Sequence, residues 1–116
     1  MHSGGPLSTE APLVIIAICK ALPGKADALR AAQENLVAET VKENGCIRYE
    51  LNQSIEDPHV LIFTESWTTE QRWKDHMHGA AMKRFQATGA NQWFAEFAIH
   101  RMRVLAGGKG VADPNS

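Results

Sequence analysis

The sequence has only two cysteines, one tyrosine and almost no net charge, and these shortages exclude several classes of protein. Lys and Arg total 12 and Asp and Glu total 13, so the formal charge is −1. A chain without excess cationic residues has few counterions of nucleic-acid phosphates to displace, which argues against nucleic-acid binding. Cys19 and Cys46 are too few for a disulfide framework or a four-cysteine zinc site. Both lie in apolar runs and are expected to be buried, reduced thiols.

Long hydrophobic segments and targeting signals are also missing. The longest nearly unbroken apolar run, 13–19, is far too short to cross a bilayer. Residues 1–12 lack the basic region and long apolar stretch of a secretory signal. We therefore expect a cytoplasmic protein with no membrane partner.

What the chain does contain is the composition of one folded domain. Its 116 residues are 44% hydrophobic and 22% charged, close to the average for globular domains. Residues 1–12 and 106–116 are small, polar and rich in Pro or Gly, which predicts a flexible tail at each end. Residues 13–105 show no linker and no internal repeat, so they are expected to form a single domain.

Apolar periodicity divides this domain into four strands and two helical regions. The runs 13–19 and 60–67 show little polar alternation, which is typical of strands covered on both faces. The segment 46–52 alternates, with Tyr49 and Asn52 on opposite faces, so at most one of them points into a pocket. The expected strands are 13–19, 46–52, 60–67 and 94–105. The expected helices are 25–43, a second one that begins after a cap at Thr68 or Thr69 and ends near Met77, and 80–87.

This order, β-α-β-β-α-β, predicts an α+β fold of the ferredoxin-like type. One face of such a sheet takes the helices. Because the first and third strands are apolar on both faces, the other face is expected to be covered by a second subunit, making a homodimer.

Several short motifs, in this order and spacing, resemble the antibiotic biosynthesis monooxygenase (ABM) domain family, including the cofactor-independent quinol monooxygenases. The residues that carry the resemblance are Pro23-Gly24-Lys25, Asn44 to Leu51, Asp57-Pro58, Glu65-Ser66-Trp67, Trp73 to Met77 and Phe85. The resemblance implies a dimeric α/β barrel with one pocket per subunit. Some members oxygenate phenols or hydroquinones with O2 alone, while others degrade haem. The haem branch is disfavoured, because its axial histidine has no counterpart in 82–86.

The resemblance also places candidate site residues. His76 matches the family's helix histidine and is the expected catalytic base, since an imidazole can take a phenolic proton near neutral pH. Trp67 and Phe85 are expected to line the substrate pocket, although a large aromatic such as Trp67 is also a common core residue. Asn52 is expected to orient an oxygen function of the substrate by hydrogen bonding.

Two other charged or ligating patterns have simpler explanations. Glu65 is expected to pair with Arg101 or Arg103 on the last strand. His76 and His78 cannot share a metal ion on a helix, because residues two apart point in nearly opposite directions. We therefore expect no metal, and the resemblance to the cofactor-independent quinol monooxygenases implies no organic cofactor.

The function expected from these residues is oxygenation of a small aromatic, such as a hydroquinone or a polyketide-type phenol, by O2. Two alternatives stay open at this point. One is a non-catalytic barrel that binds a small molecule, favoured by Ala80 and Ala81 standing where relatives often carry Pro-His. The other is an isomerase or lyase that acts on a small hydroxyketone and needs His76 but no oxygen.

Overall fold

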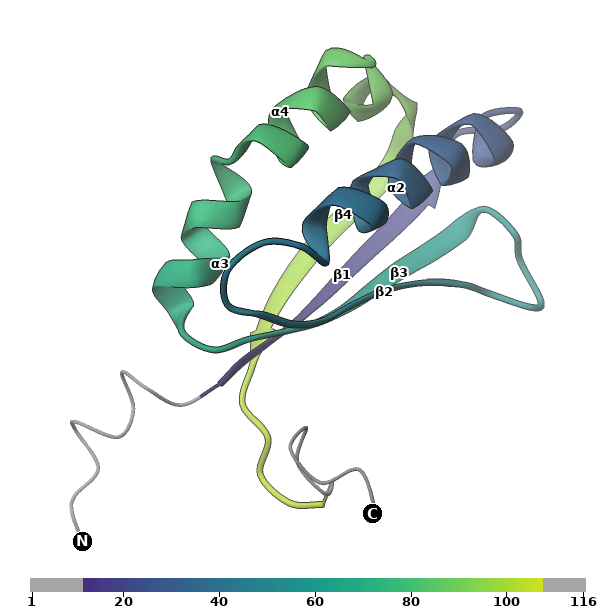
Figure 1. The fold of residues 1–116 in the computed structure, drawn as a ribbon. Helices are drawn as coiled ribbons and strands as arrows, with labels where there is room; N and C mark the ends of the chain where they lie inside the picture. Colours follow the sequence, from purple (N-terminus) through teal and green to yellow (C-terminus); the bar gives the residue numbers. More distant parts are fainter. Residues whose placement is uncertain (1–11, 108–116) are drawn as a thin grey trace, which may run out of the picture.

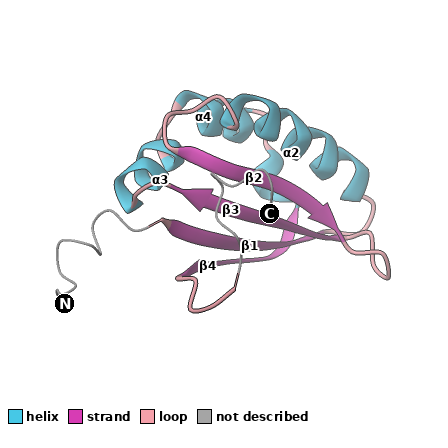
Figure 2. Cartoon of the chain, turned by 60° about the horizontal axis from the view of Figure 1, so that its bottom comes forward, coloured by secondary structure: helices cyan, strands magenta, loops and turns pink. Residues whose placement is uncertain are grey.

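A computed structural model describes residues 12–107, in which a single antiparallel sheet carries all of its helices on one face (Figure 1). Figure 2 shows the helices as one layer above the sheet. The predicted tails, 1–12 and 106–116, lie outside the described residues except for Pro12, Ala106 and Gly107. The predicted α+β, ferredoxin-like arrangement is confirmed.

The sheet has the strand order β2-β3-β1-β4, so the two most apolar strands are the central ones. Its strands are β1 (Leu13–Ala21), β2 (Cys46–Gln53), β3 (Val60–Trp67) and β4 (Phe94–Met102). Alternation along β3 is regular, with buried and half-buried residues taking turns from Val60 to Trp67. The last strand ends at Met102 rather than at the expected Leu105, and its pairing with β1 ends there too, at Val14.

The helices are α2 (Ala26–Thr40), α3 (Glu70–Met77) and α4 (Ala80–Ala87), followed by a short 3₁₀ helix, η1 (Ala90–Trp93). Thr69 caps α3, as its hydroxyl accepts a hydrogen bond from the Arg72 backbone N–H at 3.2 Å. The break at Gly79 divides α3 from α4 as predicted. The first helix is shorter than expected: it ends at Thr40, and residues 41–45 form a loop that leads into β2.

That loop passes close to the start of α3 through Gly45. The Gly45 carbonyl accepts a hydrogen bond from the Thr68 N–H at 2.8 Å, and its φ is +83°. A Cβ at this position would lie 2.6 Å from the Cβ of Arg72, so only glycine allows this approach. The contact holds the loop, and with it Glu43, against α3.

The core fills the space between the sheet and the helices, whereas no helix of the described residues covers the opposite face of the sheet. Core residues from three elements, Ile15, Leu29 and Leu61, have no exposed surface. On the outer face, Ile18 pairs with Ile62 and with Ala98 on its two sides, and Ile18 is 37% exposed. Among the described residues, no helix has the length and apolar character needed to span a bilayer.

Candidate functional site

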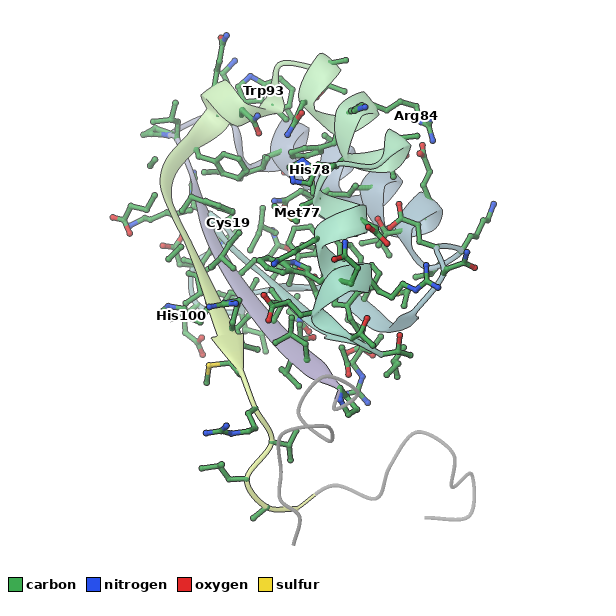
Figure 3. The ribbon with its side chains drawn as sticks, turned by 90° about the vertical axis from the view of Figure 1, so that its left-hand side faces the viewer. Cys19, Met77, His78, Arg84, Trp93 and His100 are labelled. Carbon is green, nitrogen blue, oxygen red and sulfur yellow. The ribbon has the colours of Figure 1, made fainter. Side chains whose placement is uncertain are left out.

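A cavity of about 430 Å³ lies between the inner face of the sheet and helices α2, α3 and α4. Figure 3 shows Cys19 on the side of the sheet that faces Met77, with the cavity between them. Aromatic and aliphatic side chains such as Phe63, Phe85 and Ile99 form most of the wall. This volume and lining are those of sites that take small organic ligands.

His76 reaches the cavity from α3, and its side chain is 1% exposed. Its Nδ1 lies 2.8 Å from Oε1 of Glu43 in the loop after α2. Because a carboxylate only accepts hydrogen bonds, Nδ1 carries the hydrogen and Nε2 keeps its lone pair. Burial lowers the pKa of His76, and the hydrogen bond and charge of Glu43 offset part of that effect. The imidazole is therefore neutral at neutral pH and can act as a base.

Aromatic rings hold this imidazole in place. The ring of Trp67 packs against His76 with centroids 4.9 Å apart, and Tyr49 meets His76 edge-on at 5.1 Å. These contacts fix the orientation of the ring without adding charge to it. A base whose position is set by a carboxylate on one side and aromatic rings on others is preorganised for proton transfer.

Glu65 is a second titratable group at the same end of the cavity. It is paired with Tyr49 across β2 and β3, and it accepts a hydrogen bond from Nε1 of Trp67 at 2.9 Å. Burial raises the pKa of Glu65 to about 7, although the Trp67 hydrogen bond lowers it in part. Burial, followed by the nearby Glu65, also raises the pKa of Tyr49 above its ordinary value. Glu65 can therefore hold or release a proton near neutral pH.

The expected ion pair between Glu65 and the last strand does not form. Arg101 instead donates a hydrogen bond to Glu70 on α3 at 3.0 Å. Both Glu65 and Arg101 lie on the helix-facing side, but Glu65 is buried in the centre and Arg101 is exposed near the strand end. The buried carboxyl thus has the indole N–H of Trp67, rather than a cation, as its hydrogen-bond donor.

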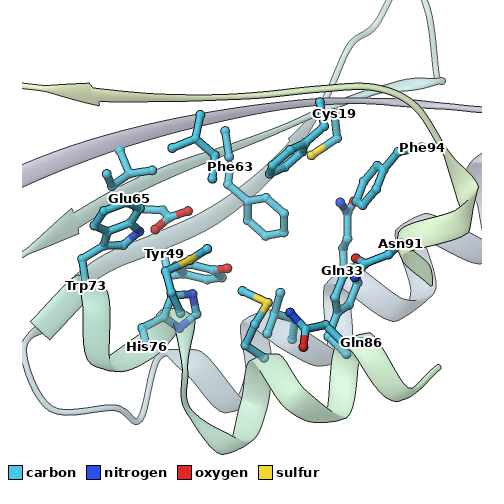
Figure 4. A pocket seen from close by; sticks show the side chains of 18 residues that line it. Cys19, Gln33, Tyr49, Phe63, Glu65, Trp73, His76, Gln86, Asn91 and Phe94 are labelled. Carbon is cyan, nitrogen blue, oxygen red and sulfur yellow. The ribbon is translucent and has the colours of Figure 1, made fainter. Parts of the chain in front are cut away.

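The opposite end of the cavity carries side-chain amides instead of titratable groups. Figure 4 shows Tyr49, Glu65 and His76 at one end, and Gln33 and Asn91 at the other. Gln33 comes from the buried face of α2 and has no exposed surface. Gln33 lies on the apolar face of α2, four residues after the buried Leu29, but a glutamine is polar, so the apolar pattern does not predict its burial.

Of the predicted site residues, His76 and Phe85 line the cavity. Trp67 is fully buried behind His76 and supports it from the core instead of lining the cavity wall. The structure does not bring Asn52 to the cavity. Alternation along β2 places Tyr49 on the inner face and Asn52 on the outer one, where its amide donates to the Ile62 carbonyl at 3.0 Å.

Other functional groups were missed because their partners are distant in sequence. Glu43 lies 33 residues from His76, and only the loop held by Gly45 brings them together.

Within residues 12–107, no cluster of three or more His, Cys, Asp or Glu side chains is arranged to hold a metal ion. His78 follows α3 as its C-cap and is exposed, away from the cavity.

Comparison with known proteins identifies relatives of the whole domain. The family model described as antibiotic biosynthesis monooxygenase matches residues 12–88. The protein PA3566 from Pseudomonas aeruginosa is 31% identical, with a TM-score of 0.78 over 84% of this chain and 98% of that one. A Chloroflexus aurantiacus protein provisionally named an antibiotic biosynthesis monooxygenase is 25% identical, with a TM-score of 0.72 over 87% and 99%. No curated protein matches.

Proposed function

The chain belongs to the antibiotic biosynthesis monooxygenase family, and we propose that it oxygenates a small hydroxylated aromatic compound with O2. The observation that carries this proposal is the buried His76, whose Nδ1 is held by Glu43 and whose ring reaches an apolar cavity. The cavity is large enough for a compound of one to three rings. The reaction needs no metal or flavin, because an electron-rich phenolate is itself the reductant.

The first step is proton transfer from the substrate hydroxyl to Nε2 of His76. The neutral imidazole of His76 is a base on the cavity wall. Its Nδ1–H donates a hydrogen bond to Glu43, so the lone pair that accepts the proton is on Nε2. The imidazolium that forms is stabilised by the Glu43 carboxylate 2.8 Å away. The phenolate is held in an apolar environment, where its electrons are more readily given to O2.

The phenolate then transfers one electron to O2, and the phenoxyl radical and superoxide combine at a ring carbon. The peroxide takes back the proton from His76 and becomes a hydroperoxide. Loss of that carbon's hydrogen and of hydroxide, as water, leaves a new carbonyl. Glu65, with a pKa near 7, can give a proton to the departing hydroxide and receive the ring proton. The balance is substrate plus O2 giving quinone plus water.

The test is oxygen uptake by protein treated with a chelator, using a panel of hydroquinones and polycyclic phenols. His76→Gln keeps the size of the side chain but removes the base, and His78→Gln is its exposed control on the same helix end. We expect wild type and His78→Gln to consume oxygen above the autoxidation blank, and His76→Gln to fall to that blank. Equal uptake by the two variants would contradict the proposal.

A second candidate, isomerisation of a small hydroxyketone, is favoured by one observation. Two proton-transfer groups, His76 and Glu65, face the same cavity, which is the arrangement that enolisation needs. The two functions differ in their need for oxygen. Turnover of a hydroxyketone under nitrogen, lost in His76→Gln, would replace the oxygenase by the isomerase. A ligand that binds without being consumed under either condition would indicate a binding protein.

We further propose that the chain acts as a homodimer. The outer face of the sheet has an apolar centre formed by Val14, Ile16, Ile18, Ile62, Ala98 and Met102, with polar residues around it. An apolar centre with a polar rim is the anatomy of a subunit interface, and the resemblance to the ABM family implies a second copy there. Ile18→Asp should convert a dimer seen by light scattering into a monomer, and a monomeric wild type would refute the assembly.

A further inference from the structure

Gln33 has an unusual environment for a buried polar side chain. It has no exposed surface, it lines the cavity, and within the described residues neither its amide nitrogen nor its amide oxygen has a hydrogen-bond partner. The Cys19 thiol lies near the Gln33 amide. Burial raises the pKa of this thiol to about 11, and the interaction with the Gln33 amide lowers it in part. A thiol is a weak hydrogen-bond partner and does not replace an oxygen or nitrogen.

A buried amide without partners destabilises the folded chain, because it gives up its hydrogen bonds to water on burial. Groups of this kind are uncommon in folded proteins and call for an explanation. The amide of Gln33 points into a cavity rather than into packed core, as Figure 4 shows. An oxygen atom of a ligand in that cavity would satisfy it.

The position of Gln33 in the cavity specifies where that oxygen lies. The titratable groups Glu65 and His76 occupy one end, and Gln33 and Asn91 line the other (Figure 4). Apolar side chains such as Phe63 fill the wall between the two ends. A matching ligand therefore has an apolar ring system with an oxygen substituent at each end.

The chemistry of the two ends differs. His76 can remove a proton, so the group beside it is an ionisable hydroxyl. The Gln33 amide cannot change its charge, but it donates through its nitrogen and accepts through its oxygen. It suits a hydroxyl, which uses both atoms, or a carbonyl, which uses the donor.

We propose that Gln33 is a specificity-determining residue that hydrogen-bonds the far oxygen of an aromatic substrate whose ionisable hydroxyl, at the opposite end, lies at His76. This inference rests on the proposed oxygenation, since it assigns the orientation of the substrate relative to the base. It predicts that aromatic compounds with a second oxygen opposite the ionisable hydroxyl bind more tightly than monohydric phenols, with 1,4-dihydroxynaphthalene as a probe. Monohydric phenols would leave the Gln33 amide unpaired and would bind more weakly.

The test compares equilibrium binding of 1,4-dihydroxynaphthalene and 1-naphthol under nitrogen, so that no turnover occurs. Trp73 lines the cavity, so quenching of tryptophan fluorescence reports binding. Gln33→Met keeps the unbranched shape and removes the hydrogen-bonding atoms, and Gln92→Met, at an exposed position outside the cavity, is the matched control. Gln33→Ala serves as a second variant that adds space without new bulk.

We expect wild type and Gln92→Met to bind the diol about tenfold more tightly than the monohydric compound, as one or two buried hydrogen bonds contribute. Both Gln33 variants should bind the two compounds within about twofold of each other. Without ligand, Gln33→Met should unfold at the same or a higher urea concentration than wild type, because it removes an unpaired buried amide. A merely structural glutamine would give the opposite change in stability.

Three results would overturn the inference: no preference in the wild type, a preference kept by Gln33→Met and Gln33→Ala, or equal loss of both ligands together with lower stability. Each can occur while oxygen uptake still depends on His76, which would leave the proposed function in place. Conversely, a Gln33-dependent preference without oxygen uptake would support the binding geometry and refute the oxygenase.

Discussion

The contact between Glu43 and His76 provides the most informative perturbation, because it acts on the base without touching the cavity wall. Glu43 does not line the cavity, and its only described contact with the site is the 2.8 Å bond to Nδ1 of His76. Glu43→Gln removes the charge and keeps the size of the side chain. An amide oxygen still accepts from Nδ1, so the imidazole keeps its tautomer but loses its counterion. Glu43 is thus a positioning and electrostatic residue.

The expected loss follows from the geometry. A hydrogen bond to a charged group contributes about 1.5 to 3 kcal/mol. The Glu43 side chain is 24% exposed, so solvent screening reduces this to about 1 to 2 kcal/mol. If the interaction is strongest when His76 is protonated, in the transition state, the substitution lowers kcat/KM by about 5- to 30-fold.

The pH profile distinguishes this role from a purely structural one. Glu43 holds the pKa of His76 higher than burial alone would set it. Its removal lowers the pKa of His76. The acid limb of the kcat/KM profile, where activity is lost because the base becomes protonated, therefore moves to lower pH. The assay is oxygen uptake against pH, with Glu39→Gln as a control at another glutamate, which pairs with Arg84 on the surface. An unchanged limb and unchanged kcat/KM in Glu43→Gln would refute the reasoning.

Three further predictions concern stability and reactivity. The pKa of Glu65 is raised from 4.5 to about 7, so its contribution to the free energy of unfolding is complete below about pH 4.5 and is lost as the pH rises through 7. In urea unfolding between pH 5 and 8, the free energy of unfolding of Glu65→Gln should therefore fall by up to about 3 kcal/mol less than that of wild type. Parallel pH profiles for the two proteins would contradict this prediction. Gly45→Ala should destabilise the fold by about 1 to 3 kcal/mol, and by more than Gly24→Ala. Both glycines have a positive φ, but only Gly45 is crowded by Arg72. Equal changes in the denaturation midpoint would disprove the steric argument. Cys19 is fully buried whereas Cys46 is half-buried, so in Cys46→Ser protein Ellman's reagent at pH 8 should modify Cys19 only at the rate of unfolding. Fast modification of that native variant would count against the burial of Cys19.

The sequence predicted the fold well because its apolar patterns are local. The apolar residues of β3 and the break at Gly79 predict the ends of these elements within a residue of the observed ones. The family resemblance likewise selected His76, which the structure places at the cavity. Element boundaries and motif residues, which depend on the local sequence, could therefore be predicted without the structure.

The rest of the site depends on contacts between segments distant in sequence. Glu43 meets His76 only because the loop after α2 packs on α3, and no periodicity records this packing. Asn52 and Tyr49 alternate in a way that permits either to face inward, and the pairing of β2 with β3 decides for Tyr49. Gln33 occupies an apolar position of α2 although it is polar, so a pattern of hydrophobic residues passes over it.

The central claim, that His76 initiates the insertion of one oxygen atom into an aromatic ring, is tested most directly with ¹⁸O2. The chelator-treated wild-type protein is mixed with 1,4-dihydroxynaphthalene, and the product is analysed at once by mass spectrometry. We expect one ¹⁸O atom in the quinone product and the other in water, with product formation by His76→Gln no faster than the protein-free blank. Unlabelled product, or equal labelling and rate in His76→Gln, would contradict the account.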